Sequence, residues 1–144
     1  SVGTNAFRYN AISTLNLGNS VTSIETWTFA NNLLKNVTIP DNVTNISTAA
    51  FANNAIGSLT LGNSVSTIDN SAFSGNQIIS LTIPNSVKII GSAAFTDNAI
   101  SSLTLGNSVT TIQDWAFNGN EISTLVIPDS VTSIGVAAFR NNTI

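Results

Sequence analysis

The chain has 144 residues, of which 42% are hydrophobic and 8% charged, and its formal net charge is −3 at pH 7. This length and composition are enough to bury the core of one domain, which excludes a disordered chain. Basic residues are too few for a nucleic-acid surface, and no apolar run reaches the roughly 18 residues of a membrane span. We therefore predict neither nucleic-acid binding nor membrane insertion.

A period of 22 residues starts at the first Phe and includes every Phe in the chain. Asn stands three positions after each Phe, and Ile or Leu stands five positions after it. A unit this small cannot close a core alone, but it buries its apolar positions when stacked on copies of itself. The period predicts a solenoid of about six and a half coils spanning residues 1–144 as a single domain. The repeated aromatic residues are Phe7, Phe29, Phe51, Phe73, Phe95, Phe117 and Phe139.

The Asn column lies between buried columns of Phe and Ile or Leu. We predict that each side-chain amide bonds backbone groups of its own turn and of the neighbouring coil. The alternative is a row of ligand-binding amides. Because a ligand site does not need all seven coils, we favour the structural interpretation.

The next element of each coil is a short strand, such as Leu81-Thr82-Ile83, with apolar residues alternating about one polar residue. Stacked in register, these strands predict one parallel sheet. Pro84 ends this strand, whereas Gly62 and Gly106 end its neighbours in the chain. This alternation makes LTLGNSV recur at 59–65 and 103–109, which indicates duplication of a two-coil unit.

Two further segments complete the coil. The stretch SVTSI at 130–134 predicts a second extended segment with Val131 and Ile134 pointing inward. The stretch GVAAF at 135–139 predicts a turn of α- or 3₁₀-helix, with the small Ala138 against the neighbouring coil. A longer helix does not fit within 22 residues.

The complete unit resembles a known repeat. The stretches LTIPNSVKIIGSAAFTDN (81–98) and LVIPDSVTSIGVAAFRNN (125–142) are similar to the leucine-rich repeats of the BspA-like, Treponema-type family. The resemblance covers the whole chain. It implies a curved leucine-rich repeat solenoid with a parallel sheet on its concave face, found mostly in bacterial surface and secreted proteins that bind host proteins or other cells. This chain differs in carrying Asn98 and its column where many members have Cys.

The residues for common enzyme and metal chemistry are missing. The chain has no His and no Cys, which removes Ser-His and Cys-His pairs and the commonest zinc ligands. Glu25 and Asp69 share a repeat position, but at two coils, roughly 10 Å, they are too far apart for a pair that shares one task. We therefore expect no enzymatic activity, no cofactor and no metal site.

Strand alternation places two rows of mostly hydroxyl side chains outward, on either side of the first Leu. We predict that this face binds a protein or glycan partner. One alternative is that Thr simply suits a solvent-facing strand. Another is that the rows bind ice, which the breaks at Asn16, Asn36 and Val126 and the curvature implied by the resemblance oppose. The candidate residues are Thr14, Asn16, Thr38, Ser58, Thr60, Ser80, Thr82, Ser102, Thr104 and Thr124.

Trp27 and Trp115 share one column, two positions before Phe, where other coils carry Ala or Ser. An exposed Trp at these positions is a candidate contact for a partner or for a second copy of the chain. The alternative is a Trp folded over the surface to cover backbone.

Both ends of the sequence fall in the middle of a repeat, and neither shows a polar capping coil. Two hypotheses follow: the array continues in flanking sequence, or chains stack end to end as an extracellular filament. The leading interpretation is a non-enzymatic adhesion or protein-recognition module, extracellular or on a cell surface as the resemblance implies.

Overall fold

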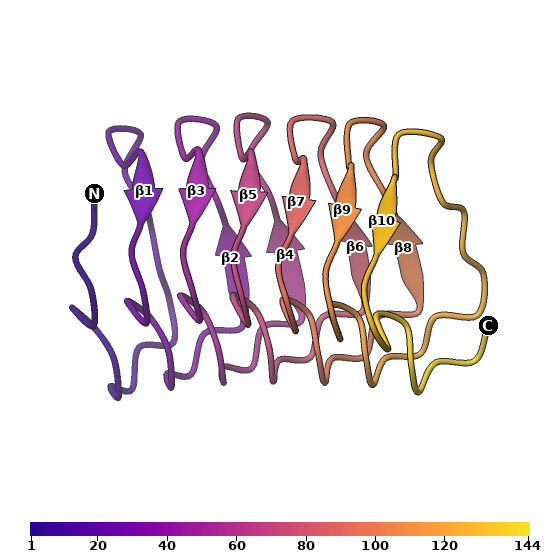
Figure 1. Ribbon diagram of the computed structural model, residues 1–144. Helices are drawn as coiled ribbons and strands as arrows, with labels where there is room; N and C mark the ends of the chain where they lie inside the picture. Colours follow the sequence, from indigo (N-terminus) through magenta and orange to yellow (C-terminus); the bar gives the residue numbers. More distant parts are fainter.

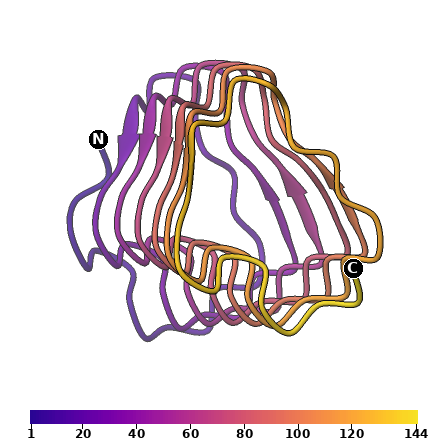
Figure 2. The same ribbon diagram turned by 45° about the vertical axis from the view of Figure 1, so that its right-hand side comes forward.

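The computed structural model describes residues 1–144 as a stack of similar coils, arranged side by side in one row (Figure 1). Viewed at an angle to the row, each coil is a loop with two extended sides and an irregular third side (Figure 2). Backbone hydrogen bonds join residues 22 apart, as between Thr44 N–H and Thr22 O at 2.9 Å. The predicted solenoid of 22-residue coils is confirmed.

One extended side forms a continuous six-stranded parallel sheet. Its strands come from the SVTSI-type segments, and each strand pairs with the equivalent residues 22 positions away, as Ile46 pairs with Ile68. The strand order is β1-β3-β5-β7-β9-β10. The bounds are β1 Ser23–Ile24, β3 Asn45–Ile46, β5 Thr67–Ile68, β7 Ile89–Ile90, β9 Thr111–Ile112 and β10 Ser133–Ile134.

The other extended side carries the Leu-containing strands, and its sheet is interrupted. β2 (Asn36–Thr38) pairs with β4 (Ser58–Thr60), and β6 (Ser80–Thr82) pairs with β8 (Ser102–Thr104). No pairing joins β4 to β6. The expectation of one sheet on these segments therefore differs from the structure, in which the continuous sheet lies on the opposite side.

The interruption follows the alternation of Gly and Pro. A coil whose strand ends in Pro is paired with the next coil, whose strand ends in Gly. The two backbones approach closely there, since a Cβ added at Gly62 would lie 2.6 Å from the Pro40 carbonyl carbon and 2.8 Å from Ile39 O. Only Gly allows this approach. Across the next step, from the β4 coil to the β6 coil, Pro84 has no N–H to donate and its ring stands between the coils. The two-coil unit is thus visible in the pairing.

The core consists of apolar columns that run the length of the solenoid. Phe51, Phe73, Phe95 and Phe117 are completely buried, and the successive Phe rings stack with centroids 5.3–5.4 Å apart. The Val and Ile columns of the SVTSI-type segments are buried as well, with Val87 and Ile90 inaccessible to solvent. The inward orientation predicted for this segment is confirmed in the central coils, whereas Ile134 of the last coil is 48% exposed.

The Asn column bonds the backbone, as predicted. Asn76 Nδ2 donates to Phe51 O of the preceding coil and to Phe73 O of its own coil, both at 3.0 Å. The Ile56 N–H donates in turn to Asn76 Oδ1 at 3.1 Å. The same three bonds recur at Asn32, Asn54, Asn98, Asn120 and Asn142.

The expected turn of helix around GVAAF is absent, because left-handed residues interrupt it. The residue two before each Phe has positive φ, with Ala93 at 55° and Trp115 at 62°. The residue two after each Phe does as well, with Asp97 at 54°. A right-handed helix cannot pass through such residues, so the segment forms consecutive turns closed by bonds such as Ala94 N–H to Gly91 O.

This column gives a stability prediction. Ala93→Gly removes the steric cost of a Cβ at positive φ, and we expect it to raise the free energy of unfolding by about 0.5 kcal/mol. Ala99→Gly is the matched control, because Ala99 is also half-buried but has ordinary φ. It should destabilise by about 0.7 kcal/mol. Equal losses in urea denaturation for both variants would contradict the predicted strain.

Candidate binding face

The binding face is the outward surface of the Leu-containing strands. In β2, β4 and β6 the central residue is buried and both neighbours are exposed, which confirms the predicted alternation. Strand pairing brings Thr38 beside Thr60 and Thr82 beside Thr104. All ten hydroxyl and amide residues predicted for this face are exposed.

The side chains of this face have no hydrogen-bond partner within the protein. None of the ten hydroxyl or amide groups donates or accepts a bond, and neither does the Asn36 side chain. Hydroxyls beside the six-stranded sheet behave differently: Ser66 Oγ donates to Thr44 O at 3.0 Å, and Thr110 Oγ1 donates to Lys88 O at 3.1 Å. The polar groups of the binding face are therefore free to bond a ligand.

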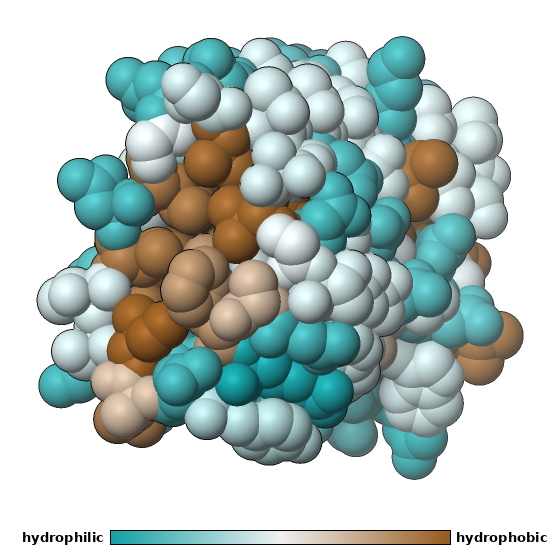
Figure 3. Space-filling model, turned by 90° about the vertical axis from the view of Figure 1, so that its left-hand side faces the viewer, coloured by the Kyte–Doolittle hydropathy of each residue, from teal (hydrophilic) through white to brown (hydrophobic).

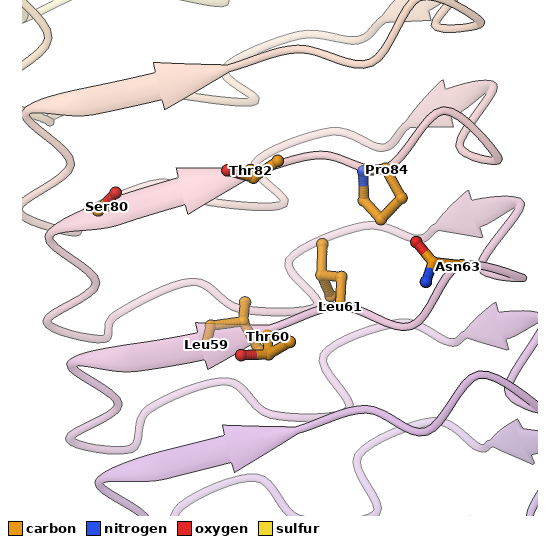
Figure 4. A pocket seen from close by; sticks show the side chains of 7 residues that line it. All are labelled: Leu59, Thr60, Leu61, Asn63, Ser80, Thr82 and Pro84. Carbon is orange, nitrogen blue, oxygen red and sulfur yellow. The ribbon is translucent and has the colours of Figure 1, made fainter.

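A hollow lies where β4 and β6 do not pair. It has a volume of about 360 Å³, and its side chains come from two neighbouring coils, as Figure 4 shows. The β4 coil contributes Leu and Thr side chains and an amide, and the β6 coil contributes hydroxyls and a proline ring. The lining residues are Leu59, Thr60, Leu61, Asn63, Ser80, Thr82 and Pro84.

Two more hollows contain the same combination of Asn and Pro with otherwise different linings. One lies around Pro40 and includes Asn19 and Asn63, and the other includes Pro128 and Asn107. Each hollow thus combines a Pro with the Asn that follows the Gly of the preceding coil. These Asn and Pro residues are not among the candidate residues predicted from the sequence. The alternation of Gly and Pro was the available signal, but it predicted strand ends and a duplicated two-coil unit rather than a site.

The broken pairing also bears on ice binding. Thr60 and Thr82 are outward residues of adjacent coils, but they belong to strands that are not hydrogen-bonded to each other. An ordered water layer over this face would need a regular spacing of hydroxyls, which the gap after every second coil interrupts. This geometry counts against the ice-binding alternative.

The two Trp residues lie apart from this face, in the turn segment that follows the six-stranded sheet. Trp27 is half-buried against a small cluster of Ala side chains and under the Arg8 guanidinium, 4.1 Å from its ring. Trp115 is 38% exposed, and Arg140 lies 5.6 Å from its ring. The structure does not bring either Trp together with the Thr and Ser rows. Trp27 covers neighbouring coils, in line with the structural alternative.

Charged groups are sparse throughout. No three His, Cys, Asp or Glu side chains lie close enough together to hold a metal ion. The structure contains no helix with the length and apolar character needed to cross a bilayer. Around the hollows the carboxylates are Asp41 and Asp129, and the first hollow has no charged side chain.

The stacked coils, the inward Leu, Ile and Val columns and the short parallel strands define a leucine-rich repeat solenoid. The model of the BspA type leucine-rich repeat region matches residues 1–120 and 67–144 with six copies, which together span the whole sequence. The chain belongs to this family. Repeats of this class generally mediate protein interactions, and proteins built from them are typically binding modules.

Several solved structures have this fold. The pneumococcal vaccine antigen PcpA is 22% identical, with a TM-score of 0.73 over 98% of this chain and 33% of its own. A leucine-rich cell surface protein of Faecalibacterium prausnitzii is 26% identical, with a TM-score of 0.61 over 96% of this chain and 46% of its own. A leucine-rich repeat protein of Bacteroides ovatus is 25% identical, with a TM-score of 0.68 over 92% of this chain and 42% of its own. This chain thus spans less than half of each. None of the curated proteins matches the sequence.

Proposed function

We propose that the chain is a non-enzymatic adhesion module, exposed on a cell surface or secreted, that recognises an extracellular protein or glycan through the binding face. The observation that carries this proposal is the contrast between the two extended sides. Hydroxyls beside the six-stranded sheet are used within the solenoid, whereas those of the binding face have no partner. The family and the F. prausnitzii relative, described as a cell surface protein, support the location.

Adhesion under flow tests this function. Beads carrying the chain should be retained on surfaces coated with mucin, which presents both protein and glycan, more strongly than on albumin. The face variant Thr38→Val/Thr60→Val/Thr82→Val/Thr104→Val removes one row of hydroxyls while keeping the β-branched shape. We expect retention to fall at least about tenfold, because many weak contacts act together.

The matched control variant is Thr44→Val/Thr110→Val/Thr132→Val, which removes hydroxyls bonded to the neighbouring coil beside the six-stranded sheet. It should be retained like the unmodified chain. Equal retention of the face variant and the control variant on mucin would contradict a role for the binding face in adhesion.

A second candidate is end-to-end stacking into a filament. Figure 3 shows hydrophobic side chains gathered on the end of the solenoid that carries the N-terminus. There Phe7 is 43% exposed, while Phe51 is inaccessible to solvent. A second copy would cover this surface, as would a further coil of the same chain. Growth of particle size with concentration in light scattering, abolished by Phe7→Ser, supports stacking; a constant monomer size contradicts it.

A further inference from the structure

Each of the three hollows of the binding face contains one Asn-Pro pair, and these pairs recur at a fixed step. The pairs are Asn19 with Pro40, Asn63 with Pro84, and Asn107 with Pro128, each 44 residues from the next. The second hollow also extends over the paired β2 and β4 coils and shares Thr60, Leu61 and Asn63 with the first. Two coils advance by roughly 10 Å, because adjacent strands lie about 4.8 Å apart. A ligand that uses all three hollows must therefore present the same chemical groups at this interval along an extended chain.

The first and third hollows contain polar side chains without a hydrogen-bond partner in the protein, whereas Asp41 and Asn42 of the second hollow are already bonded to neighbouring coils. Thr60, Ser80 and Thr82 offer free hydroxyls in the first hollow, beside strands β4 and β6 that are not bonded to each other. In the third hollow Ser130 Oγ is buried and has no hydrogen-bond partner. Buried polar groups without partners are costly, so a ligand or water that bonds them is favoured.

The apolar lining of the first hollow is small. Leu59 and Leu61 are 9% and 7% exposed at the first hollow, whereas Leu81 and Ile83 of the next coil are each 1% exposed. The Pro84 ring lies beside them (Figure 4). Sugar rings match such a lining, because they have C–H faces for apolar contact and hydroxyls at their edges for hydrogen bonds.

The lining is less suited to a protein partner. Strong protein contacts rely on aromatic and Arg side chains buried at the centre of an interface, and the three hollows contain neither. An added peptide strand needs an open sheet edge, whereas the binding face presents the flat side of its strands. A neutral, hydroxyl-rich polymer meets the chemistry of the hollows better.

We propose that the three hollows bind an uncharged β-1,4-linked glycan, with about two sugars advancing from one hollow to the next. In such chains successive sugars are flipped, so identical edges recur at every second sugar, which suits the two-coil step. The proposal rests on the proposed function, since it names the partner class of the same face. It adds the residues between the coils, Asn63 and Pro84 among them, to the hydroxyl rows.

Titration calorimetry of the full chain with sugars of increasing length tests the spacing. We expect affinity for cellohexaose or hexa-N-acetylchitohexaose to exceed that for the corresponding disaccharide at least about tenfold, because the longer chain reaches three hollows. Maltohexaose, an α-linked chain of the same size that does not extend with this repeat, should bind at least about tenfold more weakly. Affinity independent of length, or equal for both linkages, would overturn the proposal, as would no binding of either β-linked hexamer.

Two variants test the location. Thr60→Val/Thr82→Val should lower hexamer affinity at least about tenfold, whereas Thr44→Val/Thr110→Val, on the other side of the coil, should leave it unchanged. Circular dichroism checks that both variants are folded. Equal affinities for the two variants would overturn the site. A further outcome separates the glycan inference from the adhesion function. If the face variant abolishes bead retention on mucin, but neither β-linked hexamer binds the chain or competes with mucin, the partner is a protein. The glycan inference then fails and the adhesion function stands.

Discussion

Asn76→Ala should lower the free energy of unfolding by about 4 kcal/mol. The amide of Asn76 is bonded to Phe51 O and Phe73 O as donor and to the Ile56 N–H as acceptor. Truncation leaves these backbone groups without partners at a buried position, because Asn76 is only 8% exposed. Each buried group left unpaired costs about 1–3 kcal/mol, and the loss affects two adjacent coils at once.

The matched control for this prediction is Asn36→Ala. It makes the same chemical change at an exposed position whose side chain forms no hydrogen bond, and we expect a change within about 0.5 kcal/mol. Chemical denaturation monitored by circular dichroism measures both. A loss below about 1 kcal/mol at Asn76 would mean that water replaces the amide, and the column would then be dispensable for stability.

Gly62→Ala should destabilise the chain by about 3 kcal/mol. The added methyl group would meet the carbonyl groups of Pro40 and Ile39 in the preceding coil. These are backbone atoms, so they cannot turn aside as a flexible side chain would. The paired strands β2 and β4 would have to separate at this turn, and binding at the adjacent hollows should weaken in parallel.

Gly18→Ala provides the control in the same repeat position. A Cβ at Gly18 meets nothing within 4 Å, and neither Gly18 nor Gly62 has positive φ. We expect Gly18→Ala to be neutral or to stabilise by up to about 1 kcal/mol through loss of freedom in the unfolded chain. Thermal unfolding of the two variants side by side measures the difference. Similar midpoints would show that the approach of the coils is not tight.

The solenoid could be predicted from the sequence because stacked coils need the same residue type at the same position of every repeat. A column such as Phe51 and Phe73 is apolar in every coil, since each ring packs on the next. The role of Asn76 was also predictable, because a polar residue repeated within an apolar surrounding needs backbone partners. The outward position of Thr60 and Thr82 followed from the alternation of the strands.

The continuity of each sheet could not be predicted in the same way. The SVTSI-type segments and the Leu-containing segments have similar strand patterns, and pairing depends on how closely the backbones of adjacent coils approach. That distance is set by Gly62 and Gly106 nesting on Pro40 and Pro84, a relation between residues 22 apart. The hollows depend on the same spacing, so their lining residues were not identified as a site.

The left-handed turns were not predictable either. Ala93 and Trp115 occupy a conformation that their residue types disfavour, and the bonds of neighbouring coils hold them there, such as Phe95 N–H to Ala116 O at 2.8 Å. Local propensity favoured a turn of helix for this segment. Tertiary hydrogen bonding to the adjacent coil prevailed over that preference.

The pairing of Pro coils with Gly coils also limits how such an array can change in length. Removing residues 59–80 would bring the Pro40 coil directly below the Pro84 coil, and no Gly turn would remain to receive the carbonyl groups of the lower one. Removing residues 59–102 would instead leave the Pro40 coil beneath the Gly106 coil, reproducing a junction that the solenoid already contains. We therefore expect duplication and deletion to be tolerated in steps of two coils, so that the solenoid gains or loses a whole Pro-Gly pair of coils at a time.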